Sequence, residues 1–295
     1  MIQLEGVQKQ VGSFQLNVNA LKVGPGLTLV VGKNGAGKST LLKVLVTALA
    51  ADQGTITYAG KRAEDDLALI RSRLGYLPTD IDYYPQMTVG QLLAHIGELK
   101  GLPPQDLEED TRYLLKQFAL ADVAGERIAN LSEGRQRSLG IVQALLGQPV
   151  FLFLDEPLTS LDIVEQKRAV SFLYRYAARR YVVVVSHELY CWEGQCDSIV
   201  WIDEGGVAFH GTPEEWVAHP DLAVWEGTVS LREADDLQRR YRVVRRQQVE
   251  GGGQGDPLAQ HVRLIAAECP GASFSPAAGT LEDGYFLRTK HVVDR

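Results

Sequence analysis

The 295-residue sequence has few cysteines, no long apolar run and no excess of positive charge. Its three cysteines, Cys191, Cys196 and Cys269, fit neither a disulfide set nor a metal-ligand spacing, which suits a reducing compartment. No apolar stretch approaches the ~20 residues of a membrane-spanning helix, and the first ten residues lack the features of a secretory signal. The net charge of −7 argues against direct binding of nucleic acid. We therefore do not expect a secreted, membrane-spanning or nucleic-acid-binding chain.

Three apolar runs predict the central strands of a parallel sheet: LTLVV at 27–31, VFLFL at 150–154 and VVVVS at 182–186. A polar cluster follows each run, as expected where parallel strands bring their carboxyl ends to a ligand crevice. Residues from about 81 to 145 show the i, i+3, i+4 spacing of helices instead. The pattern predicts an α/β fold with a helical insert.

The character of the sequence changes after about residue 215. WEGTVSL, YRVVRRQ and HVRLIAA resemble short strands, EGGGQG predicts a flexible connection, and TLEDGYFLR predicts a closing helix. We expect a main domain over 1–215, with its core at about 1–80 and 146–215 and a helical subdomain at about 81–145. A small α+β accessory domain should occupy 216–295.

The stretch VVGKNGAGKST at 30–40 joins a buried strand to a helix and predicts a site for a nucleoside triphosphate. Its glycines let the backbone wrap an anion, and backbone N–H groups at a helix N-terminus favour phosphate. Lys38 can reach the β- and γ-phosphates, and the Ser39 hydroxyl can coordinate Mg²⁺. The expected contacts of this loop are Gly32, Asn34, Gly35, Ala36, Gly37, Lys38, Ser39 and Thr40.

The stretch FLFLDEP places Asp155 and Glu156 at the end of an apolar strand. Phosphoryl transfer needs a carboxylate in the Mg²⁺ shell and, for hydrolysis, a group that orients or deprotonates water. Asp155 suits the metal role and Glu156 the water role. Together with the loop around Lys38, the pair predicts a nucleotide hydrolase.

A second helix N-terminus occurs in LSEGRQRSLG, where Ser132 occupies an N-cap position and Gly134 exposes backbone N–H groups. Two interpretations stay open on the residues alone. The segment is either an ordinary capped helix or the completion of a nucleotide site on a different chain.

Five motifs in order, GKNGAGKST, LSEG, LFLDEP, TSLD and VVVVSHE, resemble the ATP-binding subunits of ABC transporters. The resemblance implies a P-loop NTPase fold with a RecA-like core sheet and N-terminal antiparallel strands, acting on ATP with Mg²⁺. It implies that Ser132 and Gly134 contact ATP held by a partner chain in a head-to-tail dimer. It further implies that Glu156 is the catalytic carboxylate, that His187 contacts the γ-phosphate and that Asp162 couples the two sites.

The resemblance also implies partners. A second ATPase subunit, identical or closely related, would complete the dimer, and a separate integral membrane permease would place the chain at the cytoplasmic face of the membrane. The terminal TLEDGYFL is similar to the ATPases of ABC-2-type exporters for drugs and peptide antibiotics. Two alternatives are a soluble ABC-fold ATPase of translation or DNA maintenance and a low-turnover regulatory nucleotide-binding module.

The sequence departs from the family pattern at several positions. Val11 stands where an aromatic ring usually stacks on adenine, and Phe14 is a candidate substitute. Thr79 replaces a glutamine that reaches Mg²⁺, so it would need a bridging water. Glu133 replaces a glycine, and we expect its carboxylate to point to solvent. Arg137 stands where the family usually has glutamine.

Two surface segments have alternative interpretations. Tyr83 and Tyr84 either dock a membrane subunit or pack in a satellite core under their loop. The basic stretch RRYRVVRR at 239–246 either touches anionic lipid or, as its alternation favours, forms a solvated strand face.

Overall fold

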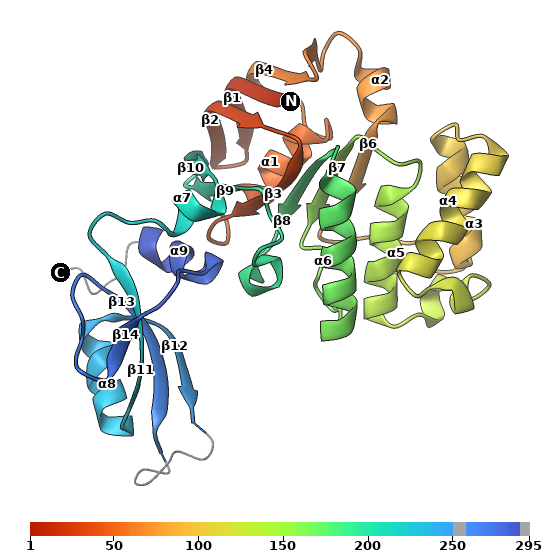
Figure 1. Cartoon of the computed structure of the whole chain (residues 1–295). Helices are drawn as coiled ribbons and strands as arrows, with labels where there is room; N and C mark the ends of the chain where they lie inside the picture. Colours follow the sequence, from red (N-terminus) through yellow and green to blue (C-terminus); the bar gives the residue numbers. More distant parts are fainter. Residues whose placement is uncertain (250–257, 290–295) are drawn as a thin grey trace. The chain divides into compact units, whose positions relative to one another are not determined.

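The computed structural model describes residues 1–249 and 258–289. The chain divides into two compact units, Met1–Gly211 and Thr212–Arg295 (Figure 1). This division lies close to the expected boundary at residue 215.

A six-stranded sheet forms the centre of the first unit, in the order β10-β9-β3-β8-β7-β6. All neighbouring pairs are parallel except β10–β9. The strands are β3 (Gly26–Val31), β6 (Leu74–Leu77), β7 (Phe151–Asp155), β8 (Tyr181–Val185), β9 (Ser198–Asp203) and β10 (Gly206–Gly211). The three predicted central strands are confirmed as β3, β7 and β8. They are nearly continuous in apolar residues because both faces of the sheet are covered.

An antiparallel sheet covers one side of this core. Its order is β2-β1-β4-β5, with β1 (Ile2–Val11), β2 (Phe14–Val23), β4 (Gln53–Tyr58) and β5 (Lys61–Arg62). One continuous apolar cluster joins this sheet, α1 (Lys38–Leu45), α2 (Leu67–Ser72) and one face of the parallel sheet. The expected N-terminal antiparallel strands are thereby confirmed.

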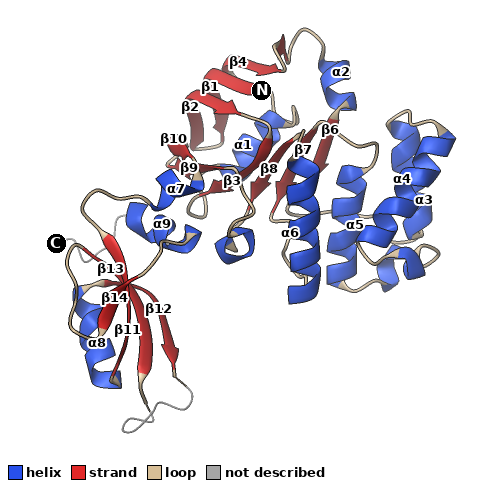
Figure 2. Cartoon of the chain, viewed as in Figure 1, coloured by secondary structure: helices blue, strands red, loops and turns tan. Residues whose placement is uncertain are grey.

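Helices cover the opposite face and form the insert. The insert contains α3 (Val89–Leu99), α4 (Pro104–Gln117), two short 3₁₀ helices (Ala121–Val123 and Ile128–Asn130) and α5 (Glu133–Leu145). Helices α3, α4 and α5 pack together, and Figure 2 shows them grouped beside the sheet. The α5 helix contacts β6 and β7, and α6 (Ile163–Ala177) contacts β3 and β8. A further 3₁₀ helix spans Leu189–Trp192.

The second unit is a small α+β domain around an antiparallel sheet of order β12-β13-β11-β14. Its elements are α7 (Pro213–Val217), β11 (Ala223–Val229), α8 (Leu231–Arg240), β12 (Arg242–Gln248), β13 (Gln260–Ala266), β14 (Phe274–Pro276) and α9 (Leu281–Arg288). The three predicted strands and the closing helix are confirmed. The α8 helix was not predicted, because only Ala234 and Leu237 of this charged helix are buried. The predicted connection EGGGQG lies outside the described residues.

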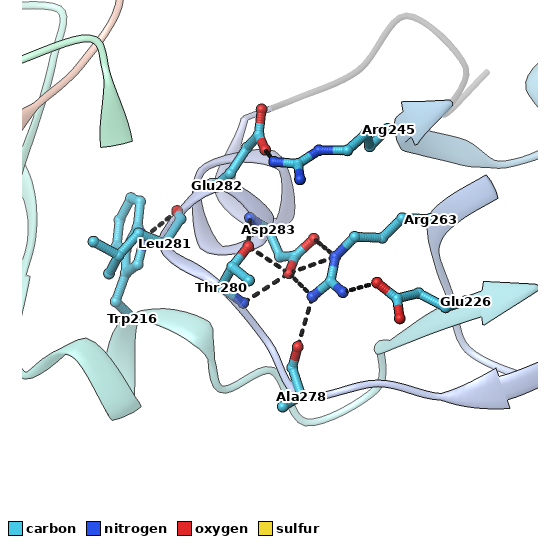
Figure 3. Close-up of polar contacts among 9 residues, drawn as sticks. All are labelled: Trp216, Glu226, Arg245, Arg263, Ala278, Thr280, Leu281, Glu282 and Asp283. Carbon is cyan, nitrogen blue, oxygen red and sulfur yellow. Dashed lines mark hydrogen bonds and ion pairs between the residues drawn. The ribbon is translucent and has the colours of Figure 1, made fainter. Parts of the chain in front are cut away.

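A buried polar network ties α9 to the sheet of the second unit (Figure 3). Arg263 of β13 is 9% exposed and forms an ion pair with Asp283 of α9, which is fully buried, and another with Glu226 of β11. The same guanidinium donates to the Ala278 carbonyl at 2.6 Å, and Asp283 accepts from the Thr280 N–H at 2.7 Å. Because neither charge faces water, removing Arg263 or Asp283 would leave the other residue buried without this counter-charge.

The basic strand of this unit is largely paired within it. Arg242 donates to the Phe286 carbonyl at 3.0 Å, and Arg245 lies 2.7 Å from Glu282. Arg246 lies 2.7 Å from Asp235. These contacts direct three of the arginines towards the unit's own helices.

Candidate functional site

The loop between β3 and α1 requires glycine at two close approaches. A Cβ on Gly32 would lie 2.3 Å from the Ile202 carbonyl oxygen. A Cβ on Gly37, whose φ is 110°, would lie 2.6 Å from the Phe14 ring. No side chain of the described chain caps α1 at Gly37, so the first N–H groups of this helix stay available for an anion.

Lys38 is the buried cation of this loop, with only 6% of its surface exposed. Its ammonium donates to the carbonyls of Gly32 at 2.8 Å and Lys33 at 2.9 Å. Burial lowers the pKa of Lys38, while the charges of Glu156 and Asp155 oppose that shift. Hydrogen bonds from an ammonium to charged phosphate oxygens are stronger than those to neutral carbonyls, so bound phosphate can replace these carbonyls as the partners of Lys38.

A hollow of about 560 Å³ opens in front of this loop. Its lining residues are Val11, Phe14, Asn34, Gly35, Gly37, Lys38, Ser39, Thr40, Thr79, Asp155, Glu156, Val185 and His187. The fold therefore brings most of the expected nucleotide contacts to one place. Gly32 and Ala36 belong to the loop but do not line the hollow.

The acidic pair lies at the end of β7, on the wall of the hollow. Asp155 is 2% exposed, and no group of the described chain donates a hydrogen bond to its Oδ1. The orphaned carboxylate oxygen of Asp155 and the hydroxyl of Ser39 line the same hollow, and such hard oxygen donors are the ligands that Mg²⁺ prefers. The residues present therefore fit a magnesium ion.

Glu156 and His187 contact each other at the mouth of this wall. Glu156 Oε2 accepts the His187 backbone N–H at 3.2 Å, and His187 Nε2 lies 3.3 Å from Glu156 Oε1. Burial raises the pKa of Glu156 to about 7, and the charge of Asp155 adds to this while the hydrogen bond from His187 opposes it. Burial and the charge of Lys38 lower the pKa of His187. A carboxylate with a pKa near neutrality is suited to accept a proton from water.

Tyr76 of β6 was not predicted from the sequence to belong to the site. Its hydroxyl is buried and has no hydrogen-bond partner among the described residues. Burial and the charge of Asp155 raise its pKa to about 12. Tyr76 pairs with Phe153 across parallel strands, which places its side chain on the same sheet face as Asp155. Only the strand register reveals this proximity.

Three further expected contacts, away from the glycine loop, also lie outside the hollow. Ser132 is exposed and caps α5, accepting the Arg135 N–H at 3.3 Å. Gly134 is buried, and a Cβ there would lie 2.8 Å from the Ser160 carbonyl oxygen. Asp162 caps α6 by accepting two backbone N–H groups at 2.8 Å. The capped-helix interpretation therefore describes the geometry of α5, and contact with a second nucleotide stays a prediction.

The two tyrosines of the loop after β6 differ in environment. Tyr83 donates its hydroxyl to the Gln136 carbonyl at 2.7 Å, and burial raises its pKa. Tyr84 is 62% exposed. Tyr83 thus packs under the loop, while Tyr84 is free to contact a partner. Glu133 is exposed at the first turn of α5, as expected.

Comparison with known proteins gives consistent similarities. Residues 16–159 match the family model described as ABC transporter. The uncharacterised ABC transporter ATP-binding protein YxlF of Bacillus subtilis is 31% identical over 221 residues, which cover 75% of this chain and 70% of YxlF. The glutamine transport ATP-binding protein GlnQ of Bacillus subtilis is 30% identical over 229 residues, covering 75% of this chain and 94% of GlnQ.

A solved dimeric structure of MJ0796, described as a bacterial ABC transporter cassette, has the same fold as the first unit. The TM-score is 0.65 at 22% identity, over 72% of this chain and 98% of that one. Along the described part of the present chain, no helix combines the length and apolar character of a membrane span.

Proposed function

Because the chain belongs to the ABC transporter family of ATP-binding proteins, we propose that it hydrolyses ATP to drive a membrane permease carried by separate chains. The family itself implies ATP binding and hydrolysis. One observation carries the proposal for this chain: Lys38, the orphaned Asp155 carboxylate and the Glu156–His187 pair line a single hollow.

Different residues of the hollow have different roles in the proposed hydrolysis. The N–H groups of the glycine loop and the ammonium of Lys38 bind and orient the phosphates. Ser39 and Asp155 would hold Mg²⁺, which neutralises phosphate charge when bound. Glu156 orients a water molecule and accepts its proton, and its raised pKa suits that transfer near neutral pH. His187 holds the Glu156 carboxylate and faces the same hollow.

Phe14 and Thr79 are the candidates for two further contacts, stacking on adenine and water-mediated coordination of Mg²⁺. Phe14 lines the hollow, and its ring packs against Gly37 of the glycine loop. An adenine that stacks on this ring would therefore lie next to the loop. Thr79 also lines the hollow and would reach Mg²⁺ through a bridging water.

Ser132, Gly134 and Asp162 are proposed to act across a head-to-tail dimer. They lie at helix N-termini outside the chain's own hollow, as contacts to a second copy's nucleotide would. The second subunit is proposed to be identical or a close paralogue, and MJ0796 shows that a cassette of this fold can dimerise. The permease would hold the pair at the cytoplasmic face, with Tyr84 among the exposed side chains available to it.

Export is the direction we propose, on the resemblance of the terminal TLEDGYFL to exporter ATPases. Affinity purification of the tagged full chain from mild-detergent membrane extracts tests the partner. A polytopic membrane protein in comparable amount supports the proposal, whereas recovery of ribosomal or other non-membrane partners alone contradicts it.

ATP turnover of the same preparation tests the chemistry. We expect hydrolysis by the wild type and by Glu98→Gln, an exposed substitution on α3, and no turnover by Glu156→Gln. Hydrolysis by Glu156→Gln near the wild-type rate would remove Glu156 from its proposed role.

A further inference from the structure

Arg137 is a buried arginine whose direct hydrogen-bond partners are all backbone carbonyls. It lies on the second turn of α5 and is only 7% exposed. The guanidinium charge is therefore desolvated, and no carboxylate of the described residues is in direct contact with it. Burial lowers its pKa, and the more distant charges of Tyr83, Asp155, Glu156 and Asp80 oppose that shift. Burying a charged group away from water costs free energy, which the hydrogen bonds of the guanidinium must offset.

The contacts of Arg137 bridge the carboxyl ends of two neighbouring parallel strands. Nη1 donates to the carbonyls of Pro78 at 3.0 Å and Thr79 at 2.8 Å, just after β6. Nη2 donates to the carbonyls of Asp155, at the end of β7, and of Glu156, the latter at 2.5 Å. Nε also donates to the Glu156 carbonyl, at 3.1 Å. One rigid planar group thus holds the carbonyls of four residues in two adjacent strand ends, and three of these residues, Thr79, Asp155 and Glu156, line the hollow.

The backbone at Glu156 needs this support. Its φ is 51°, a left-handed conformation that costs a residue other than glycine about 1–3 kcal/mol and persists only where the surrounding structure enforces it. The Glu156 N–H donates to Val185 at 2.9 Å, and its carbonyl accepts from Arg137. The backbone of Glu156 is thus held on both sides of the residue, and its carboxylate contacts His187 at the wall of the hollow.

We propose that Arg137 is a positioning residue for ATP hydrolysis, fixing the backbone of Glu156 and of Thr79 to α5. The inference rests on the proposed function. Because Ser132 and Gly134 begin the same helix, a shift of α5 on contact with a partner would move Arg137 and, through it, the Glu156 carboxylate. The helix then links one nucleotide site to the other within a single chain.

The test compares Arg137→Gln and Arg137→Lys with Arg112→Gln, which removes a charge from the exposed surface of α4. Gln offers two donors and Lys a single flexible ammonium, so neither can hold four carbonyls in one plane. Since misplacing a reacting group by about 1 Å costs on the order of 100-fold, we expect kcat to fall about 30- to 100-fold in Arg137→Gln and about 5- to 10-fold in Arg137→Lys. The KM for ATP should stay within about two-fold of wild type, and Arg112→Gln should match wild type in both constants.

A second measurement is independent of turnover. Hydrogen exchange of peptides covering Asp155–Leu161 should accelerate about tenfold in Arg137→Gln, with exchange in α4 unchanged. A merely stabilising arginine would lower the melting temperature and leave kcat per folded molecule and this local exchange pattern unchanged, which would overturn the proposal. If Arg137→Gln does not fold, the test uses Arg137→Lys, and a kcat of this variant within two-fold of wild type would also overturn the proposal. A wild type without turnover refutes the proposed function itself, and that result is distinct from normal turnover in the variants.

Discussion

Glu156→Gln should abolish activity, and at neutral and higher pH it should also make the folded protein more stable than the wild type. The Glu156 side chain is 18% exposed, and burial raises its pKa from 4.5 to about 7 in the folded protein. The charges of Asp155 and Glu188 act in the same direction, and the His187 N–H and the charge of Lys38 oppose them. The folded state therefore disfavours the ionised carboxylate that hydrolysis requires.

The pH dependence follows from this difference. Below pH 4.5 the carboxyl is protonated in both states and costs nothing. As the pH rises from 4.5 to about 7, the unfolded chain releases its proton first and stability falls by about 1.4 kcal/mol per pH unit. Above about 7 the loss is complete, at roughly 3 kcal/mol. Glutamine has no proton to lose, so the variant escapes this penalty.

Thermal unfolding of both proteins at pH 5 and pH 8 measures the effect. The stability advantage of Glu156→Gln should grow by about 2–3 kcal/mol between these pH values, or roughly 5–10 °C in melting temperature for a unit of this size. The exposed substitution Glu98→Gln should show no such growth. An advantage that is the same at both pH values, or that shrinks at pH 8, would refute the assignment of a raised pKa to Glu156.

Three further outcomes are expected. The kcat/KM for ATP should fall about tenfold per pH unit below about pH 7, because Glu156 must be ionised to accept a proton; a profile flat from pH 6 to 8 would contradict this. Lys38→Met should weaken ATP binding at least tenfold by calorimetry, since no other buried cation lines the hollow among the described residues; unchanged affinity would contradict the phosphate role. Asp283→Asn should destabilise the second unit by about 3–5 kcal/mol in urea unfolding, because Arg263 loses its fully buried counter-charge; a change below about 1 kcal/mol would show that Glu226 suffices.

Much of the main unit could be predicted because its signals are contiguous in sequence. The runs that became β3, β7 and β8 are apolar along their whole length, which marks strands covered on both faces. The glycine loop and Lys38 lie within a dozen residues, so spacing alone predicts an anion site. In the second unit β11, β12, β13 and α9 were recognisable, but α8 was not, because its buried face is only two residues wide.

The sequence by itself determined the chemistry available to this protein: a phosphate loop, an acidic pair at a strand end and a helix capped by Ser132. The tertiary structure decided which of these groups meet. Tyr76 comes near Asp155 through strand register, Phe14 packs on Gly37 across two sheets, and Arg137 reaches carbonyls 18 and 59 residues away. Contacts over such separations depend on how sheets and helices pack, and no local pattern of residue types records that geometry.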